Sequence, residues 1–229
     1  MCGRFLLTAP VDALRQLFGV TESPNFPARY NIAPTQDSAV VRLTPEGARE
    51  LVLMRFGLVP SWAKDLAIGA SLINARSDGV ATKPSFRAAY RQRRCLVPAD
   101  GFYEWKPGPA KGPKQPWLIA RADRATFAFA GLWERWQGES QTVHSFSIIT
   151  TDANKALEPI HHRMPVILDP KDYAAWLDPR NERAQALLQA IPVSTRVNAV
   201  RNDDAECIAP AAPEGDAPAA PAPAQGSLF

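Results

Sequence analysis

Runs rich in β-branched and large apolar residues recur along the chain and predict β-strands. They cover residues 39 to 43, 50 to 56, 95 to 98, 116 to 121, 126 to 133, 143 to 150 and 165 to 168. The segment 44 to 47, Thr-Pro-Glu-Gly, joins the first two runs, and Ala-Asp-Arg at 122 to 124 joins the fourth and fifth. Both are typical of hairpin turns, so we expect a mostly antiparallel sheet.

Helical spacing of apolar residues is found in fewer places. An apolar stripe that follows Thr8, a candidate N-cap, predicts a helix over residues 9 to 18. Further helices are expected near 84 to 92, after Asp169 and Pro170, and near 181 to 190. The pattern predicts an α+β fold of mainly antiparallel strands with flanking helices, and such strands can curl into a barrel.

The pattern changes after residue 208. From 209 to 224, 13 of 16 residues are Ala or Pro, with no apolar periodicity that a core would need. We therefore expect one folded domain over residues 1 to 208 and an extended, disordered linker over 209 to 224. The last five residues, 225 to 229, place Leu228 and Phe229 at the end of a tail that has nothing to pack against.

Composition narrows the class of protein. The 229 residues are 46% hydrophobic and 21% charged, which is ordinary for a soluble globular protein. No apolar run is long enough to span a membrane, and the N-terminus carries no signal sequence, so we expect a cytoplasmic protein without membrane contact. The three cysteines, Cys2, Cys95 and Cys207, fit neither a disulfide framework nor zinc-ligand spacing. We expect no metal and no cofactor.

The positive charges are mostly arginine. The net charge is only +3, but 19 of the 26 basic residues are Arg. The planar guanidinium suits phosphate, which favours nucleic acid as a partner. A GC-rich genome would raise Arg, Ala and Pro together, and the chain is rich in all three, so composition alone leaves both explanations open.

Cys2 is the first candidate for chemistry. If an aminopeptidase removes Met1, residue 2 presents a thiol and a free α-amine on adjacent carbons, a 1,2-aminothiol. A sizeable fraction of such an amine is unprotonated at neutral pH, while the thiol is mostly protonated. The pair can attack an acyl group, or condense with an aldehyde to an imine that the sulfur closes to a thiazolidine. A buried small cysteine with no chemical role is the alternative.

Three further polar residues lie in segments that the pattern assigns to buried or half-buried strands and turns: Asn74, Glu104 and His161. Glu104 stands between Tyr103 and Trp105, where a buried carboxylate is costly unless it is paired or protonated. It is therefore a candidate general acid or base. A solvated glutamate on the polar face of a strand, and a core histidine satisfied by backbone, are the alternatives for Glu104 and His161.

Six motifs taken together, in order, resemble the SRAP family (SOS response-associated peptidase) from residue 2 to about 208. They are Met-Cys-Gly-Arg-Phe at 1 to 5, Arg-Tyr-Asn-Ile-Ala-Pro at 29 to 34, Phe-Gly-Leu-Val-Pro-Ser-Trp at 56 to 62, Ile-Asn-Ala-Arg at 73 to 76, Gly-Phe-Tyr-Glu-Trp at 101 to 105 and His-His-Arg-Met-Pro at 161 to 165. The resemblance implies a single SRAP domain that recognises abasic sites in single-stranded DNA. It also implies that the protein traps them covalently as a thiazolidine and protects the lesion.

The resemblance also assigns roles to residues. It makes Cys2 the nucleophile, Asn74 the orienting amide, Glu104 the acid or base, and His161 the residue that assists ring opening and crosslink reversal. Arg4, Arg76 and Arg163 are implied phosphate contacts, and Trp62 is the main candidate for stacking on bases. The chain departs from the family in carrying Asp78 where the family often has Glu, and in lacking a second aromatic residue after Trp62 in the loop 63 to 65.

Four arginines near the predicted helix at 84 to 92 add basic charge: Arg87, Arg91, Arg93 and Arg94. Contacts with DNA and a solvated helix face are both open for them. Two other functions compete with abasic-site trapping. A peptidase or self-processing protein would use the same residues, and a non-catalytic adaptor would bind single-stranded DNA without needing Cys2. The protein is expected to act as a monomer.

The tail suggests a second partner. Gln-Gly-Ser-Leu-Phe at 225 to 229 is similar to the short peptide by which bacterial repair proteins dock on the sliding clamp. Gln225 would anchor the peptide, and Leu228 and Phe229 would enter an apolar pocket. The Ala and Pro spacer would hold the motif clear of the domain, which would concentrate the protein at the replication fork, near the nucleoid. An unselected sticky end is the alternative.

Overall fold

Two sheets form the framework of the molecule, which is known from a computed structural model that describes residues 2–106, 114–181 and 184. The smaller sheet has the strand order β2 (Arg29–Ile32), β1 (Arg4–Leu7), β7 (Gly101–Lys106) and β8 (Gln115–Ile119). The larger sheet has the order β11 (Arg163–Pro165), β10 (Thr142–Asp152), β4 (Arg49–Phe56), β3 (Asp37–Leu43), β6 (Arg94–Ala99), β9 (Phe127–Gln137) and β12 (Ile167–Leu168), and β5 (Asn74–Arg76) pairs with β10. The expected α+β class is confirmed.

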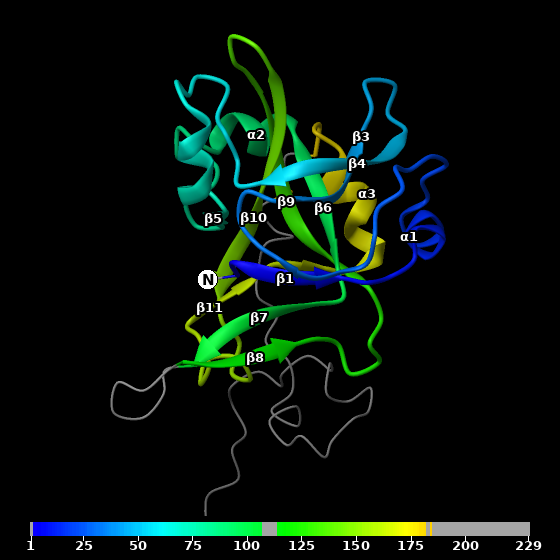
Figure 1. Cartoon of the computed structure of the whole chain (residues 1–229), viewed down its shortest axis with the longest axis vertical. Helices are drawn as coiled ribbons and strands as arrows, with labels where there is room; N and C mark the ends of the chain where they lie inside the picture. The colour runs from blue at the N-terminus through cyan, green and yellow to red at the C-terminus, as the bar shows by residue number, and fades with distance from the viewer. Residues whose placement is uncertain (1, 107–113, 182–183, 185–229) are drawn as a thin grey trace, which may run out of the picture. The chain divides into compact units, whose positions relative to one another are not determined.

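Five strands of the larger sheet close into a barrel. β10 pairs with β9 along one side and with β4 along the other, so the ring runs β10, β4, β3, β6, β9 and back to β10. Among the described strands, only the pairings of β10 with β4 and with β5 are parallel, and Figure 1 shows the long β9 and β10 crossing the middle of the molecule. The mostly antiparallel, barrel-forming sheet predicted from the pattern is therefore confirmed.

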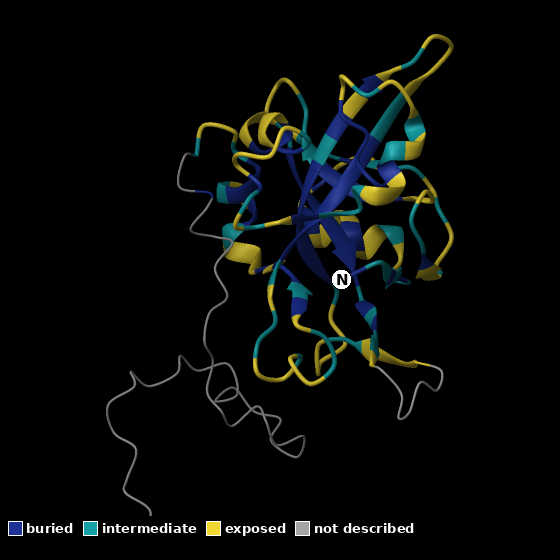
Figure 2. Cartoon of the chain, turned by 90° about the vertical axis from the view of Figure 1, so that its left-hand side faces the viewer, coloured by how far each residue is buried: buried dark blue, intermediate teal, exposed yellow. Residues whose placement is uncertain are grey.

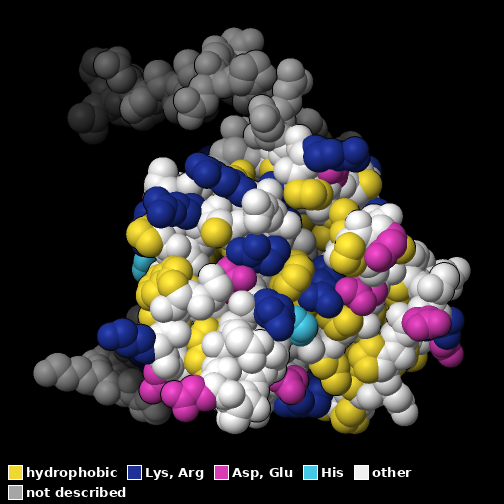
Figure 3. Space-filling view, turned by 90° about the horizontal axis from the view of Figure 1, so that it is seen from above, with side chains coloured by type: hydrophobic (Ala, Val, Ile, Leu, Met, Phe, Trp, Pro, Cys, Tyr) yellow, Lys and Arg dark blue, Asp and Glu magenta, His cyan; other side chains and the backbone are white. Residues whose placement is uncertain are grey.

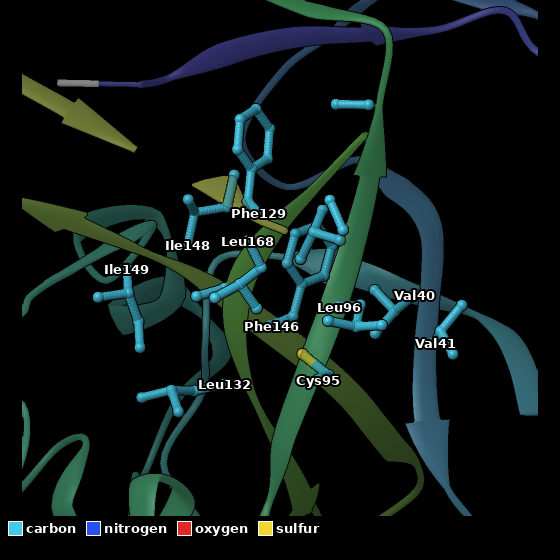
Figure 4. Close-up of a cluster of buried hydrophobic side chains, with 14 of the residues drawn as sticks. Val40, Val41, Cys95, Leu96, Phe129, Leu132, Phe146, Ile148, Ile149 and Leu168 are labelled. Atoms are coloured by element: carbon cyan, nitrogen blue, oxygen red, sulfur yellow. The ribbon is translucent and has the colours of Figure 1, made fainter. Parts of the chain in front are cut away.

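The core lies inside this barrel and under the smaller sheet. Aromatic rings link the two sheets, because Phe5 of β1 meets Phe56 of β4 and Phe129 of β9 edge to face, with ring centroids 5.5 and 6.0 Å apart. Phe146 of β10 stacks on Phe56 at 5.1 Å. Figure 4 shows Phe129, Phe146 and Ile148 pointing into one cluster, and Figure 2 shows the buried residues on the inner strands. Edge-to-face and offset contacts of this kind add to the burial of apolar area.

The helices pack at the periphery. α1 (Val11–Phe18) buries Leu14 and Phe18 and ends at Gly19, whose φ of 65° suits a residue without a Cβ atom. The expected N-cap is wrong: Pro10 occupies that position, while the Thr8 hydroxyl donates to the Asp100 carboxylate. α2 (Arg87–Gln92) lies within the range predicted at 84 to 92.

The helix predicted after Asp169 and Pro170 consists of a turn of 3₁₀ helix and α3. η3 (Pro170–Asp172) leads into α3 (Tyr173–Leu177), and Asp169 accepts a hydrogen bond from Lys171 N–H, as a helix start requires. A further 3₁₀ helix, η1 (Leu66–Ser71), lies between β4 and β5. Most of the helix expected near 181 to 190, and all of Cys207, the linker and the tail, lie outside the described residues.

The remaining differences concern the strands. The expected hairpin at 122 to 124 is wrong, because β8 pairs with β7 in the smaller sheet while β9 belongs to the larger sheet. The run expected at 165 to 168 is divided between β11 and β12, because Val166 changes partners: its N–H binds the Ile149 carbonyl, and its carbonyl accepts from Ala130. β1 and β2 were not expected as strands, although together with β7 they carry the N-terminus to the barrel.

Candidate functional site

Cys2 lies directly before strand β1, next to the barrel. β1 lies between β2 and β7, with Arg4 opposite Tyr103 and Phe5 opposite Phe102, and Cys2 precedes it as a fully buried residue. Asn74, the first residue of β5, donates from Nδ2 to the Cys2 carbonyl oxygen at 3.1 Å. The same amide reaches the Ile148 carbonyl of β10 at 3.5 Å. Asn74 therefore ties residue 2 to the barrel wall.

Strand alternation places Glu104 on the inner face of β7. In β7, Phe102 and Glu104 are buried, while Tyr103 and Trp105 are partly exposed, so Glu104 lies on the inner face with only 4% of its surface exposed. Burial raises the pKa of the Cys2 thiol well above its ordinary value, and the negative charge of Glu104 raises that pKa further. The carboxylate is thus close enough to Cys2 to act on its protonation.

His161 completes the group from the segment before β11. Its ring stacks on His162 with centroids 4.4 Å apart, and Nδ1 lies 2.9 Å from the backbone N of Arg163 and 3.1 Å from its carbonyl oxygen. Partial burial lowers the pKa of His161, while the charge of Glu104 opposes that shift. The imidazole is therefore mainly neutral at pH 7. In that state Nδ1 accepts from the Arg163 N–H and Nε2 carries the proton.

The structure thus brings together Cys2, Asn74, Glu104 and His161, four residues that the sequence places up to 159 positions apart. A buried thiol with a raised pKa holds little thiolate, which makes the α-amine of an N-terminal cysteine the better first nucleophile. A neutral imidazole and a carboxylate can move protons around that amine. Among the described residues, no group of three or more His, Cys, Asp or Glu is arranged to hold a metal ion.

The predicted phosphate contacts differ in exposure. Arg4 donates to the Asn31 side chain at 3.0 Å and lies 5.9 Å from the Trp105 ring. Arg76 is 54% exposed and forms a two-point pair with Asp78. The Arg163 side chain is only 4% exposed.

Arg163 is held inside the fold. Its Nη2 donates to the Thr150 carbonyl at 2.7 Å, and its Nη1 pairs with Asp152 at 3.1 Å. Contact of Arg163 with DNA stays a prediction, and it requires phosphate to replace the Asp152 carboxylate. Sequence spacing gives no sign of this pair, because Asp152 meets Arg163 only through the register of β10 with β11.

The loop after β4 carries Trp62, whose side chain is exposed. Trp62 is 59% exposed, and the neighbouring Ala63 carbonyl accepts from Trp136 Nε1 at 2.7 Å. The loop starts at Gly57, where φ is 115° and an added Cβ atom would lie 2.4 Å from the Gly69 carbonyl oxygen. Backbone therefore packs directly on backbone at this point, and only glycine fits. The stacking role of Trp62 stays a prediction.

The basic residues around α2 separate into two kinds. Arg94 is 5% exposed and donates to the carbonyls of Trp176, Tyr90 and Asp178, so it holds the end of α3. Arg93 pairs with the buried Glu134 at 2.7 Å. Arg87 and Arg91 are exposed. On the face seen in Figure 3, basic and acidic side chains are interspersed, so that face offers no continuous basic patch.

Comparison with known proteins shows which family the chain is similar to. A family model described as SOS response associated peptidase (SRAP) matches residues 1–203. Abasic site processing protein YoqW of Bacillus subtilis is 39% identical over 224 residues, which cover 91% of this chain and 99% of that protein. Abasic site processing protein HMCES of Rattus norvegicus is 33% identical, over 92% of this chain and 76% of that protein.

Solved structures share the fold. A crystal structure of a protein from Bacteroides thetaiotaomicron has a TM-score of 0.74 and 25% identity, and the match covers 92% of this chain and all of that one. A phage-related protein from Bordetella bronchiseptica, 30% identical, has a TM-score of 0.67 over 82% of this chain and 87% of its own. In the described part of this chain, no helix is long and apolar enough to cross a membrane.

Proposed function

The chain belongs to the SOS response associated peptidase (SRAP) family, and on that premise we propose that it recognises abasic sites in single-stranded DNA and crosslinks to them through Cys2. Met1 must first be removed, so that Cys2 carries a free α-amine. The observation that carries the proposal is the meeting of Cys2, Asn74, Glu104 and His161 at the start of β1. Relatives named abasic site processing proteins support the choice of substrate.

The reaction needs the sugar to open first. An abasic deoxyribose is mostly a closed hemiacetal, and His161, placed beside Glu104, can transfer the proton that releases the aldehyde. The Cys2 amine then adds to the aldehyde and expels one water to give an imine. The thiol adds across the C=N bond, with its proton going to nitrogen, and closes a five-membered thiazolidine. Glu104 is the buried carboxylate that can carry protons between these steps.

Asn74 and the arginines supply position rather than chemistry. The Asn74 amide holds the residue 2 carbonyl and so fixes the direction of the amine and thiol. Arg4, Arg76 and Arg163 are the proposed backbone contacts, and Trp62 offers an exposed ring on which a base can stack. Contacts with phosphate position DNA without reading its sequence, so we expect no sequence preference.

The name of the family points to the competing activity, that of a peptidase. A cysteine peptidase needs a thiolate, and burial together with the Glu104 charge disfavours a thiolate at Cys2. The experiment offers the protein an abasic oligonucleotide and a peptide, and compares the wild type with Cys2→Ala and with a form that keeps extra residues before Cys2. We expect a heat-stable DNA adduct with the wild type alone. Peptide cleavage without any adduct would instead support the peptidase.

The tail is a separate proposal that rests on sequence, since residues 225 to 229 lie outside the described part of the chain. Gln225, Leu228 and Phe229 are proposed to bind the sliding clamp and bring the domain to single-stranded lesions at the fork. A labelled peptide of residues 220 to 229 should bind the clamp of the same organism, and the peptide with Leu228 and Phe229 both changed to Ala should not. Equal binding by both peptides would contradict the proposal.

A further inference from the structure

Arg76 is already bound to an acidic group that has the geometry of a phosphate contact. Its Nε and Nη2 donate to the two carboxylate oxygens of Asp78 at 3.1 and 2.6 Å. The fork of a guanidinium binds a carboxylate and a phosphate in the same two-point way. Asp78 therefore occupies the donors that a DNA phosphate would need, and both side chains are more than half exposed.

Arg163 also pairs with a carboxylate, through a single contact, and the charges of the two pairs act on each other. Its Nη1 lies 3.1 Å from an Asp152 carboxylate that is 86% exposed. The charge of Asp152 acts on Arg76, and the charge of Arg163 acts on Asp78. Two cations and two anions thus form one network beside Asn74, and its net charge is zero.

The Arg–Asp pair alone would not justify an inference, because the chain repeats it. Arg121 and Asp123 form the same two-point pair, with distances of 2.9 and 2.7 Å, and Arg180 pairs with Asp178 in the same spacing. Arg76 differs in its place. It ends the three-residue strand β5 that Asn74 begins, and it lies opposite Thr150, the residue whose carbonyl holds Arg163.

We infer that Asp78 and Asp152 compete with DNA phosphates for Arg76 and Arg163, and so determine how weakly the protein holds DNA that carries no reactive aldehyde. The inference rests on the proposed function. Each phosphate that binds must displace a carboxylate, so the exchange gains little free energy. Intact DNA is then released quickly, whereas an abasic site is retained by its covalent bond to Cys2. The acidic residues therefore increase selectivity for the lesion.

The test measures equilibrium binding of intact single-stranded DNA by fluorescence anisotropy over a series of salt concentrations. Asp78→Asn should bind about 2- to 5-fold more tightly than the wild type at about 0.1 M salt, as expected when an exposed competing charge is lost. Its slope of log K against log salt should steepen by up to about 0.7, because a full phosphate contact is gained. Asp78→Glu, which keeps the carboxylate, should bind like the wild type, and so should the matched control Asp123→Asn.

A double-mutant cycle decides whether Asp78 acts through Arg76. In an Arg76→Ala background, Asp78→Asn should no longer tighten binding. Weaker binding by Asp78→Asn alone would overturn the inference and make Asp78 a support for Arg76, and tightening that persists without Arg76 would overturn it in favour of general repulsion. A wild type that neither binds single-stranded DNA nor forms an adduct would contradict the proposed function, and this inference with it.

Discussion

Replacing Glu104 by Gln removes both the proton-transfer group and the negative charge of this buried carboxylate, and the two losses predict opposite changes in the crosslinking rate. The change keeps the size and polarity of the side chain in a position that is only 4% exposed. It also removes a charge that raises the pKa of the Cys2 thiol, so the thiolate population should increase. Were sulfur attack to limit the rate, Glu104→Gln would therefore speed up crosslinking.

We expect the opposite result. General acid or base assistance contributes about 10²- to 10⁴-fold to a rate, which exceeds the gain from a somewhat larger thiolate fraction, because burial is the main cause of the raised thiol pKa and persists in the variant. Crosslinking by Glu104→Gln should therefore be at least about 100-fold slower than in the wild type. Affinity for intact single-stranded DNA should stay within about twofold, as expected for an isosteric change that removes no phosphate donor.

The assay is a single-turnover time course, with excess protein over an abasic oligonucleotide and the adduct separated on a denaturing gel. Glu134→Gln is the matched control, because Glu134 is 5% exposed and pairs with Arg93 away from Cys2. That variant should lose stability but crosslink at the wild-type rate at a temperature where it is folded. A wild-type or faster rate with Glu104→Gln would refute the proton-transfer role.

Three further predictions concern the stability of the fold. Arg94→Met should lower the free energy of unfolding by about 2 to 4 kcal/mol in urea titrations, since three backbone carbonyls lose their donor; an unchanged value would mean that water replaces it fully. Gly57→Ala should slow crosslinking and lower the melting temperature, because its Cβ atom would meet the Gly69 carbonyl; wild-type values for both would show that the loop adapts. Because the pKa of His161 is lower in the folded than in the unfolded chain, the unfolded chain binds a proton at this residue more readily. The stability that neutral His161 contributes to the fold should therefore be lost as pH falls below about 6.5. In His161→Gln that part of the pH dependence should disappear from the unfolding curves.

Local pattern was enough for the elements that depend on nearest neighbours. The apolar stripe of α1 identified a helix whose Leu14 and Phe18 are buried. In β7, by contrast, alternation alone favours a solvated Glu104, and the structure buries that side chain. The six sequence motifs identified the candidate site residues, although they could not show how these residues lie in space. The capping residue of α1 was wrong because a distant partner, Asp100, takes the Thr8 hydroxyl, and no local pattern contains that contact.

Features that depend on which strands pair, and in which register, could not be predicted from the sequence. The barrel closes through the parallel pairing of β10 with β4, which joins Phe146 to Phe56 across 90 residues. The antiparallel register of β10 with β11 likewise pairs Asp152 with Arg163, whose side chain is 4% exposed, and no local pattern predicts that pair. Arg94 likewise looked like one of four basic residues, and only the packing of α3 shows it as a structural donor.

Intact mass spectrometry of the protein after mixing with an abasic oligonucleotide tests the central claim most directly. The wild type should lack Met1 and form an adduct whose mass is the sum of protein and DNA minus one water, as condensation of an aldehyde with a 1,2-aminothiol requires. The adduct should survive both heat and borohydride unchanged, because a thiazolidine has no C=N bond to reduce. An adduct that gains two hydrogens with borohydride, or one of equal heat stability formed by Cys2→Ala, would contradict a thiazolidine at Cys2.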